Sequence, residues 1–184
     1  MNSIAAQNRY NNPVLIAPGF GSSGPNHWQT LWQKENPEFI RIEQKSWFAP
    51  NAEEWIESID RQVSKLGPDS IIVAHSLACV ALVLWANKTQ LKIKGALLIA
   101  PADSESSEFR LNTTGFTSIP KTSLPFKSIV VSSTDDQFCK IDRACEFATN
   151  WGSQFVNIGA KGHINAESNL GAWLEGRIFL EQII

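Results

Sequence analysis

The feature that most constrains the fold of this sequence is residues 70–86, whose character changes at Ser76. Residues 71–73 form a β-branched run suited to a buried strand, and residues 77–86 form an Ala- and Leu-rich run suited to a buried helix. Ser76 is therefore expected on a tight turn from strand to helix. Such turns can present a serine nucleophile when small residues lie two places away, as Ala74 and Ala78 do here. A serine that only caps the helix would give the same local pattern.

The rest of the chain alternates short apolar strands with amphipathic or apolar helices. Strands are expected at Pro13–Ala17, Phe39–Ile42, Ile71–Val73, Gly95–Ala100, Ile129–Ser132 and Phe155–Ile158. Helices are expected after an Asn26 cap, and at Ala52–Leu66, Leu77–Ala86, Ile141–Trp151 and Leu170–Ile183. In the first of these helices, Trp28 and Trp32 lie at helical spacing and are expected to be core residues. This order predicts right-handed crossovers and an α/β fold: about six strands in a mainly parallel sheet, with helices on both faces. The polar loop 102–125 is expected to form a minimal lid at most.

Length, charge and cysteine content narrow the class of protein. The 184 residues and 43% hydrophobic content suit one domain, residues 1–184, with residues 1–12 as a flexible N-terminus. A net charge of −2 favours neither nucleic acid nor an anionic membrane as partner. The expected partner is a small-molecule substrate. The segment 1–12 lacks the apolar core of a signal peptide, and the three cysteines lack metal-ligand spacing. A cytoplasmic protein with free thiols, no bound metal and no cofactor is expected.

Every candidate functional group follows a predicted strand. The loop 18–25 follows the first strand, Ser76 the third, the Asp135–Asp136 pair the fifth, and His163 the sixth. In open parallel sheets, ligands bind beyond the carboxyl ends of the strands. These groups are therefore expected at one edge of the sheet.

Catalysis by serine needs a base, an acid that orients the base, and donors for the oxyanion. His163 lies in a Gly-rich loop that could carry its imidazole over the sheet edge, and we assign it as the base. His75 is adjacent to Ser76, where neighbouring side chains diverge, so it is expected to support the turn. The oxyanion donors are expected to be the backbone N–H groups of Leu77 and Phe20.

Several carboxylates could serve as the acid. Asp135 and Asp136 are adjacent in the loop after the fifth strand, and their spacing alone does not separate them. Asp103, after the fourth strand, and Glu167 are further alternatives. With either Asp135 or Asp136 as the acid, the chain order is serine, acid, histidine, which is the order of α/β hydrolases.

The glycine loop also allows a different interpretation. Gly19, Gly21 and Gly24 match Gly-x-Gly-x-x-Gly after a strand, and Glu43 lies near the position of a ribose-binding acid. A dinucleotide-binding turn opens directly into its helix, however, whereas Pro25 and Asn26 delay the helix here. This interpretation also leaves the serine, acid and histidine unexplained.

Taken together, the motifs resemble a known family. They are Pro18–Ser22, His27-Trp28-Gln29 with Trp32, Val73–Leu77, Asp135-Asp136 and Gly162–Ser168. Over nearly its whole length the chain resembles the small serine hydrolases of the α/β-hydrolase superfamily grouped with retinoblastoma-binding protein 9 and its bacterial YdeN-like relatives.

The resemblance implies an α/β-hydrolase fold and assigns roles. Ser76 matches the nucleophile, His163 the base, and Asp136, the second member of the pair, the acid. His27 recurs near the oxyanion loop and is expected, with Trp47, to line the pocket. Ala78 stands where the family has glycine, which adds only a methyl group at the turn.

We therefore expect a carboxylesterase-like serine hydrolase that cleaves small carboxylic esters or related acyl compounds through an acyl-enzyme. A catalytically weak module that keeps the fold for binding or regulation is the alternative. A dinucleotide-binding protein is the third interpretation.

Overall fold

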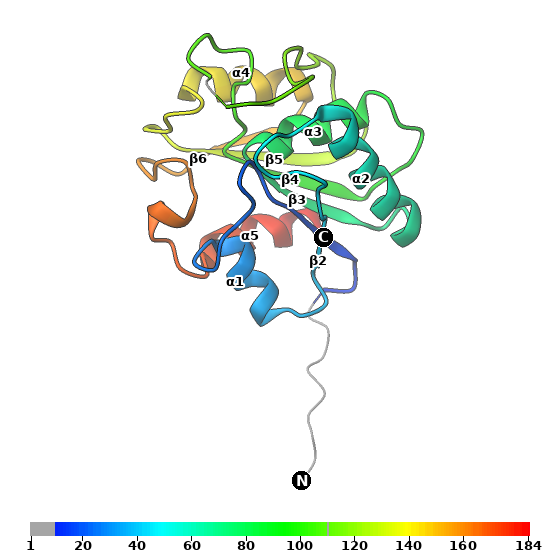
Figure 1. The fold of residues 1–184 in the computed structure, drawn as a ribbon. Coiled ribbons are helices and arrows are strands. Elements are labelled where there is room, and N and C mark those ends of the chain that lie inside the picture. Colours follow the sequence, from blue (N-terminus) through cyan, green and yellow to red (C-terminus); the bar gives the residue numbers. More distant parts are fainter. Residues whose placement is uncertain (1–9, 110) are drawn as a thin grey trace.

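The computed structural model describes residues 10–109 and 111–184 and shows a single six-stranded sheet (Figure 1). The strands are β1 Val14–Ala17, β2 Ile40–Arg41, β3 Ile71–His75, β4 Gly95–Ile99, β5 Lys127–Ser132 and β6 Gln154–Asn157. Their order is β2-β1-β3-β4-β5-β6, and all neighbouring pairs are parallel. The predicted α/β architecture with one parallel sheet is confirmed.

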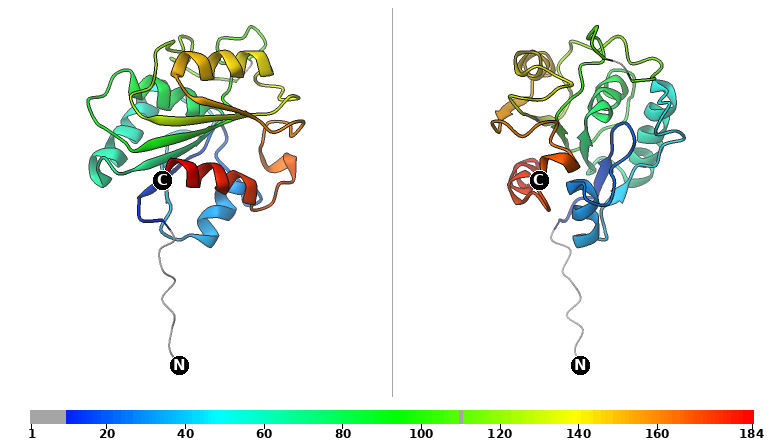
Figure 2. Two further views of the ribbon diagram at one scale, coloured as in Figure 1. Left: turned by 180° about the vertical axis from the view of Figure 1, so that it is seen from behind. Right: turned by 60° about the vertical axis from the view of Figure 1, so that its left-hand side comes forward.

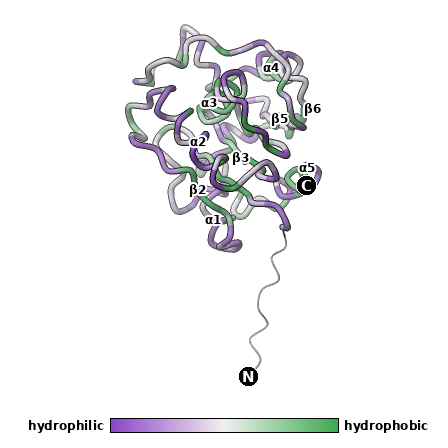
Figure 3. The backbone as a smooth tube through the Cα atoms, turned by 90° about the vertical axis from the view of Figure 1, so that its right-hand side faces the viewer, coloured by the Kyte–Doolittle hydropathy of each residue, from purple (hydrophilic) through white to green (hydrophobic). Residues whose placement is uncertain are grey.

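Helices cover both faces of the sheet. They are α1 Trp28–Glu35, α2 Ala52–Leu66, α3 Leu77–Ala86, α4 Ile141–Trp151 and α5 Leu174–Ile183, with a short 3-10 turn, η1, at Ala166–Ser168. Figures 1 and 2 show α1 and α5 together on one face and α2, α3 and α4 on the other. Each face buries its own apolar cluster, and each cluster contains three buried tryptophans: Trp55, Trp85 and Trp151 in one, and Trp28, Trp32 and Trp173 in the other. In Figure 3 the apolar α3 is coloured as hydrophobic, and hydrophilic colours lie mainly on the outer segments of the chain.

The direction in which the chain moves across the sheet reverses between β1 and β3. From β1 the chain passes to β2 at one edge and then returns to β3 on the other side of β1. The loops after β1 and β3 therefore diverge at the carboxyl edge of the sheet, which is where open α/β sheets bind ligands. These loops carry Phe20 and Ser76.

The structure changes some details of the sequence prediction. His27, rather than Asn26, caps α1, because its Nδ1 accepts the backbone N–H of Gln29 at 3.2 Å. Helix α5 begins at Leu174 instead of residue 170, because the preceding residues form η1 and a loop with Trp173 in the left-handed region.

The N-terminal expectation concerned residues 1–12, of which 1–9 lie outside the described residues. Tyr10 is buried and packs against Phe39, with ring centroids 5.1 Å apart. The Asn12 side chain donates to the carbonyl of Asp69 at 3.0 Å. Within residues 10–109 and 111–184, no helix has the length and apolar character needed to cross a bilayer.

Candidate active site

Ser76 occupies a strained turn between β3 and α3. Its backbone has φ 56° and ψ −124°, a region that non-glycine residues rarely adopt, and within the described chain its side chain makes no capping hydrogen bond. The hydroxyl is thus not used to cap the helix. Gly19 makes the turn possible from the neighbouring loop, because a Cβ there would lie 2.8 Å from the Ser76 Cβ and 2.9 Å from the His75 carbonyl oxygen.

Three side chains from separate segments meet at this turn. The Ser76 Oγ lies 2.8 Å from Nε2 of His163, and Nδ1 of the same ring lies 2.9 and 2.8 Å from the two carboxylate oxygens of Asp136. A carboxylate only accepts, so Nδ1–H donates to Asp136 and Nε2 is left to accept the serine hydroxyl. All three residues are buried, which strengthens these polar contacts.

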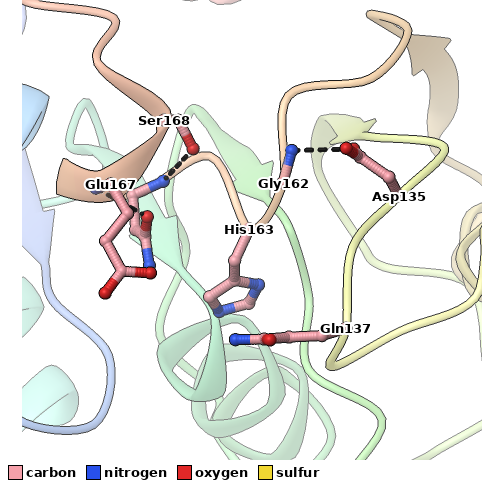
Figure 4. A pocket seen from close by; sticks show the side chains of 7 residues that line it. Asp135, Gln137, Gly162, His163, Glu167 and Ser168 are labelled. Atoms are coloured by element: carbon pink, nitrogen blue, oxygen red, sulfur yellow. Dashed lines mark hydrogen bonds between the residues drawn. The ribbon is translucent and has the colours of Figure 1, made fainter.

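The carboxylates that sequence spacing left open have distinct positions. The Asp136 carboxylate is held facing the ring by the backbone N–H of Phe138, 2.8 Å from Oδ1. Asp135 turns away from the ring and accepts the backbone N–H of Gly162 at 2.7 Å (Figure 4). Hydrogen bonds from Ser133 and Gly162 lower the pKa of Asp135. Asp135 therefore anchors the histidine loop, and Asp136 contacts the imidazole.

Neither of the two remaining acids is hydrogen-bonded to the His163 imidazole among the described residues. Asp103 forms an ion pair with Arg143, with Oδ2 3.4 Å from Nε. Glu167 is exposed on η1 and is one of the residues that line the pocket drawn in Figure 4.

Two buried donors fix the backbone that carries His163. The His75 Nε2–H donates to the carbonyl oxygen of His163 at 2.9 Å, and the Trp28 Nε1–H donates to the next carbonyl, that of Ile164, at 2.8 Å. Ile164 has φ 49°, a costly value for a β-branched residue, so its conformation needs such support. Sequence patterns assigned Trp28 only to the core. Its helical spacing carries no signal for this hydrogen bond.

The backbone amides expected to bind an oxyanion lie beside the serine. Neither the Leu77 N–H, at the start of α3, nor the Phe20 N–H has an acceptor among the described residues. A Cβ on Gly19 would lie 3.4 Å from the Leu77 nitrogen, so the two loops approach closely at this point. Arg41 braces the β1 loop from β2, donating to the hydroxyl of Ser22 at 3.3 Å. Both amides are thus free to donate to a ligand.

A pocket of about 270 Å³ opens over the serine. Its lining comprises Phe20, Ser22, Gly24, His27, His75, Ser76, Leu111, Phe138, His163, Asn165, Ala166 and Glu167. Trp47 lies outside this described lining: its ring packs on Trp55 at 5.8 Å, and its carbonyl accepts the N–H of Gly21 at 2.9 Å. The structure thus brings His27 to the pocket and Trp47 to the wall behind the β1 loop.

Three imidazoles are packed in series at the pocket. The His75 ring centroid is 4.9 Å from that of His163 and 4.8 Å from that of His27. Burial, followed by the charges of Arg41 and His163, lowers the pKa of His27 to about 3. Burial also lowers the pKa of His75 well below its usual value, with smaller contributions from His27 and His163. His27 and His75 are therefore neutral near pH 7, and the ring that contacts the serine is that of His163.

The glycine loop has a structural use that differs from dinucleotide binding. Gly19 allows close approach to the serine turn, and α1 begins only at Trp28, well past Gly24. A dinucleotide turn would open directly into the helix. Among residues 10–109 and 111–184, no group of three or more His, Cys, Asp or Glu side chains is arranged to hold a metal ion.

The parallel sheet, the serine at a strained strand-to-helix turn and the order of the functional loops define an α/β-hydrolase fold. A family model described as serine hydrolase matches residues 14–182, and the chain belongs to that family. No curated protein matches the sequence significantly.

Solved structures agree with this assignment. A YdeN-like hydrolase from Pectobacterium atrosepticum is similar with a TM-score of 0.84 and 29% identity, covering 93% of this chain and 89% of that one. The ydeN product of B. subtilis has a TM-score of 0.77 and 19% identity, over 92% and 97% of the two chains. A monoacylglycerol lipase from Paleococcus ferrophilus shares the fold, with a TM-score of 0.70 and 13% identity over 95% and 96%. The predicted resemblance to YdeN-like serine hydrolases is confirmed.

Proposed function

We propose that this serine hydrolase cleaves small carboxylic esters or related acyl compounds with Ser76, His163 and Asp136 as its catalytic triad. The observation that carries the proposal is the continuous chain of contacts from the Ser76 Oγ to His163 Nε2 and from Nδ1 to Asp136, each at 2.8–2.9 Å. The Phe20 and Leu77 amides, which have no acceptor among the described residues, would supply the oxyanion donors.

In this mechanism, the Ser76 oxygen attacks the carbonyl carbon of the ester while His163 Nε2 takes the hydroxyl proton. The negative charge that develops on the carbonyl oxygen is stabilised by the Phe20 and Leu77 N–H groups. Collapse of the tetrahedral intermediate breaks the bond to the alcohol, which leaves with the proton from His163. Water then attacks the acyl-enzyme by the same route, releasing the acid and restoring the serine.

Asp136 would act through the imidazole. Its carboxylate accepts Nδ1–H, which keeps Nε2 free as the base and stabilises the imidazolium formed during attack. His27 is proposed as part of the pocket wall, since its neutral ring lines the pocket without contacting the serine hydroxyl. The substrate is proposed to be a small molecule and the location cytoplasmic. The free state of Cys79, Cys139 and Cys145 supports a reducing compartment.

Labelling with a fluorophosphonate and hydrolysis of p-nitrophenyl acetate test the nucleophile. Ser76→Ala should abolish both, whereas Ser128→Ala should retain both, because Ser128 is a buried serine at the amino end of β5, bonded to Ser153. Labelling that persists in Ser76→Ala would exclude Ser76. A wild-type protein that is neither labelled nor active would favour the alternative of a binding module.

The adjacent aspartates provide a matched test of the acid. Asp136→Asn should lower kcat on the order of 10³- to 10⁴-fold, because an amide facing Nδ1 favours the wrong tautomer. Asp135→Asn should have a much smaller effect, since an asparagine Oδ1 can still accept the Gly162 N–H. A larger loss in Asp135→Asn would contradict the assignment of Asp136.

A further inference from the structure

Phe48 is a large aromatic residue left in solvent beside the candidate active site. Phe48 is 70% exposed and lies in the loop between β2 and α2. Single exposed apolar residues are common on protein surfaces, so exposure by itself indicates nothing. The position of this ring is more informative, because it lies against the rim of the pocket over Ser76.

The contact to the pocket runs through Phe20. The rings of Phe20 and Phe48 meet edge to face, with centroids 5.9 Å apart and planes at 89°. Phe20 itself lines the pocket together with Ser76 and His163. Apolar surface therefore continues from the reacting serine, along Phe20, to the exposed face of Phe48.

The loop that carries Phe48 is held in place on both sides of the ring. On one side, the carbonyl of Trp47 accepts the N–H of Gly21 at 2.9 Å, which ties this loop to the β1 loop. On the other, the N–H of Ala49 donates to the hydroxyl of Ser46 at 3.1 Å. Phe48 is thus presented by a backbone that is already bonded to the proposed oxyanion loop, and a ligand would not have to order it first.

The pocket has further apolar lining but little room. Leu111 and Phe138 line it, and the Phe138 ring centroid is 4.5 Å from that of His163. The volume of about 270 Å³ accommodates the reacting ester and a short chain. Any longer apolar group bound at the serine has to leave this pocket, and Phe20 and Phe48 offer it an apolar path.

We propose that Phe48, together with Phe20, forms a subsite for an apolar group of the ester substrate that extends beyond the pocket. This inference rests on the proposed esterase function and narrows its substrate class to esters with a medium-length aliphatic or aromatic group. Contact with the exposed ring would remove apolar surface from water on both the ligand and Phe48.

Chain-length selectivity of Phe48→Ala tests the subsite. The kcat/KM values for p-nitrophenyl acetate, butyrate and octanoate would be measured for the wild type and the variant. Phe48→Ala should lose roughly tenfold in kcat/KM for the octanoate, because covering on the order of 50 Å² of apolar surface at about 25 cal/mol per Å² corresponds to that factor. The acetate value should stay unchanged, since an acetyl group remains inside the pocket.

Leu174→Ala serves as the matched control. Leu174 is exposed to 71%, almost as much as Phe48, but lies on α5 and outside the described pocket lining. Leu174→Ala should leave the ratio of the kcat/KM values for octanoate and acetate at the wild-type value. A second test compares the hydrolysis of phenyl acetate and 1-naphthyl acetate by the wild type and Phe48→Ala. A loss of activity in Phe48→Ala that is confined to the naphthyl ester would assign the subsite to the alcohol part of the substrate.

The outcomes separate this inference from the proposed function. Equal loss of activity toward acetate and octanoate in Phe48→Ala, or no change in either series, would overturn the subsite while leaving the esterase intact. Absence of Ser76-dependent ester hydrolysis in the wild type would overturn both.

Discussion

The clearest consequence of the buried imidazoles concerns stability below neutral pH. Burial, with Arg41 and His163 nearby, lowers the pKa of His27 from its usual 6.5 to about 3 in the folded protein. The unfolded chain therefore binds a proton at this residue between these pH values, and the folded protein does not. The contribution of His27 to the free energy of unfolding is therefore fully present above pH 6.5 and is lost progressively as the pH falls toward 3.

The size of this effect follows from the separation of the two pKa values. At about pH 5 the unfolded-state pKa is about 1.5 units above the pH, and each unit corresponds to about 1.4 kcal/mol. His27 alone should therefore lower the free energy of unfolding by about 2 kcal/mol between about pH 8 and pH 5. The lowered pKa of His75 also decreases the free energy of unfolding as the pH falls, in the wild type and in every variant that retains His75.

Urea unfolding of the wild type and His27→Asn at about pH 8 and pH 5 would measure this contribution. Asparagine is a good helix N-cap, so it can replace the acceptor that His27 gives to Gln29 while removing the titrating group. The wild type should lose about 2 kcal/mol more than the variant over this pH range. Equal losses would refute the conclusion that His27 is neutral because it is buried, whatever the absolute stabilities of the two proteins.

Two further predictions concern the geometry around the serine. Gly19→Ala should lower kcat/KM on the order of 100-fold or more, because its Cβ would collide with the serine turn. Gly24→Ala should be tolerated, because a Cβ there meets no atom of the described residues within 4 Å; ester hydrolysis and circular dichroism would check both variants. Trp28→Phe keeps an aromatic ring but removes the donor to the loop of His163, and should lower kcat about tenfold with KM unchanged. Trp32→Phe removes an equivalent donor, 2.7 Å from the Ala172 carbonyl, and should leave kcat unaltered; equal effects of the two tryptophan variants would show that the loss is only structural.

The sequence alone predicted most of the framework. The helices Ala52–Leu66, Leu77–Ala86 and Ile141–Trp151 have the predicted bounds. The first and third are amphipathic and end at Gly67 and Gly152, and the second is a continuous apolar run. The carboxyl edge of the sheet also followed from the alternation of strands and helices. Both depend on neighbours within a few residues along the chain.

The contacts among side chains from distant segments could not be predicted in this way. Asp135 and Asp136 are adjacent in the chain, and this spacing is the same whichever of them faces the histidine. The contact between Asp136 and His163 joins residues that are 27 positions apart. The directions of the two aspartates are set by the loop conformation, through hydrogen bonds to Phe138 and Gly162. Only the resemblance to a family had distinguished them beforehand.

The same limit applies to the supports of the site. Periodicity identified Trp28 as a core residue, and it is one, but its hydrogen bond spans 136 residues to Ile164. The sequence determined which elements form and which edge of the sheet carries the polar groups, because local patterns encode both. The tertiary structure decided which aspartate contacts the histidine, which donors hold its loop and which aromatic ring borders the pocket, because these depend on the packing of segments far apart in the chain.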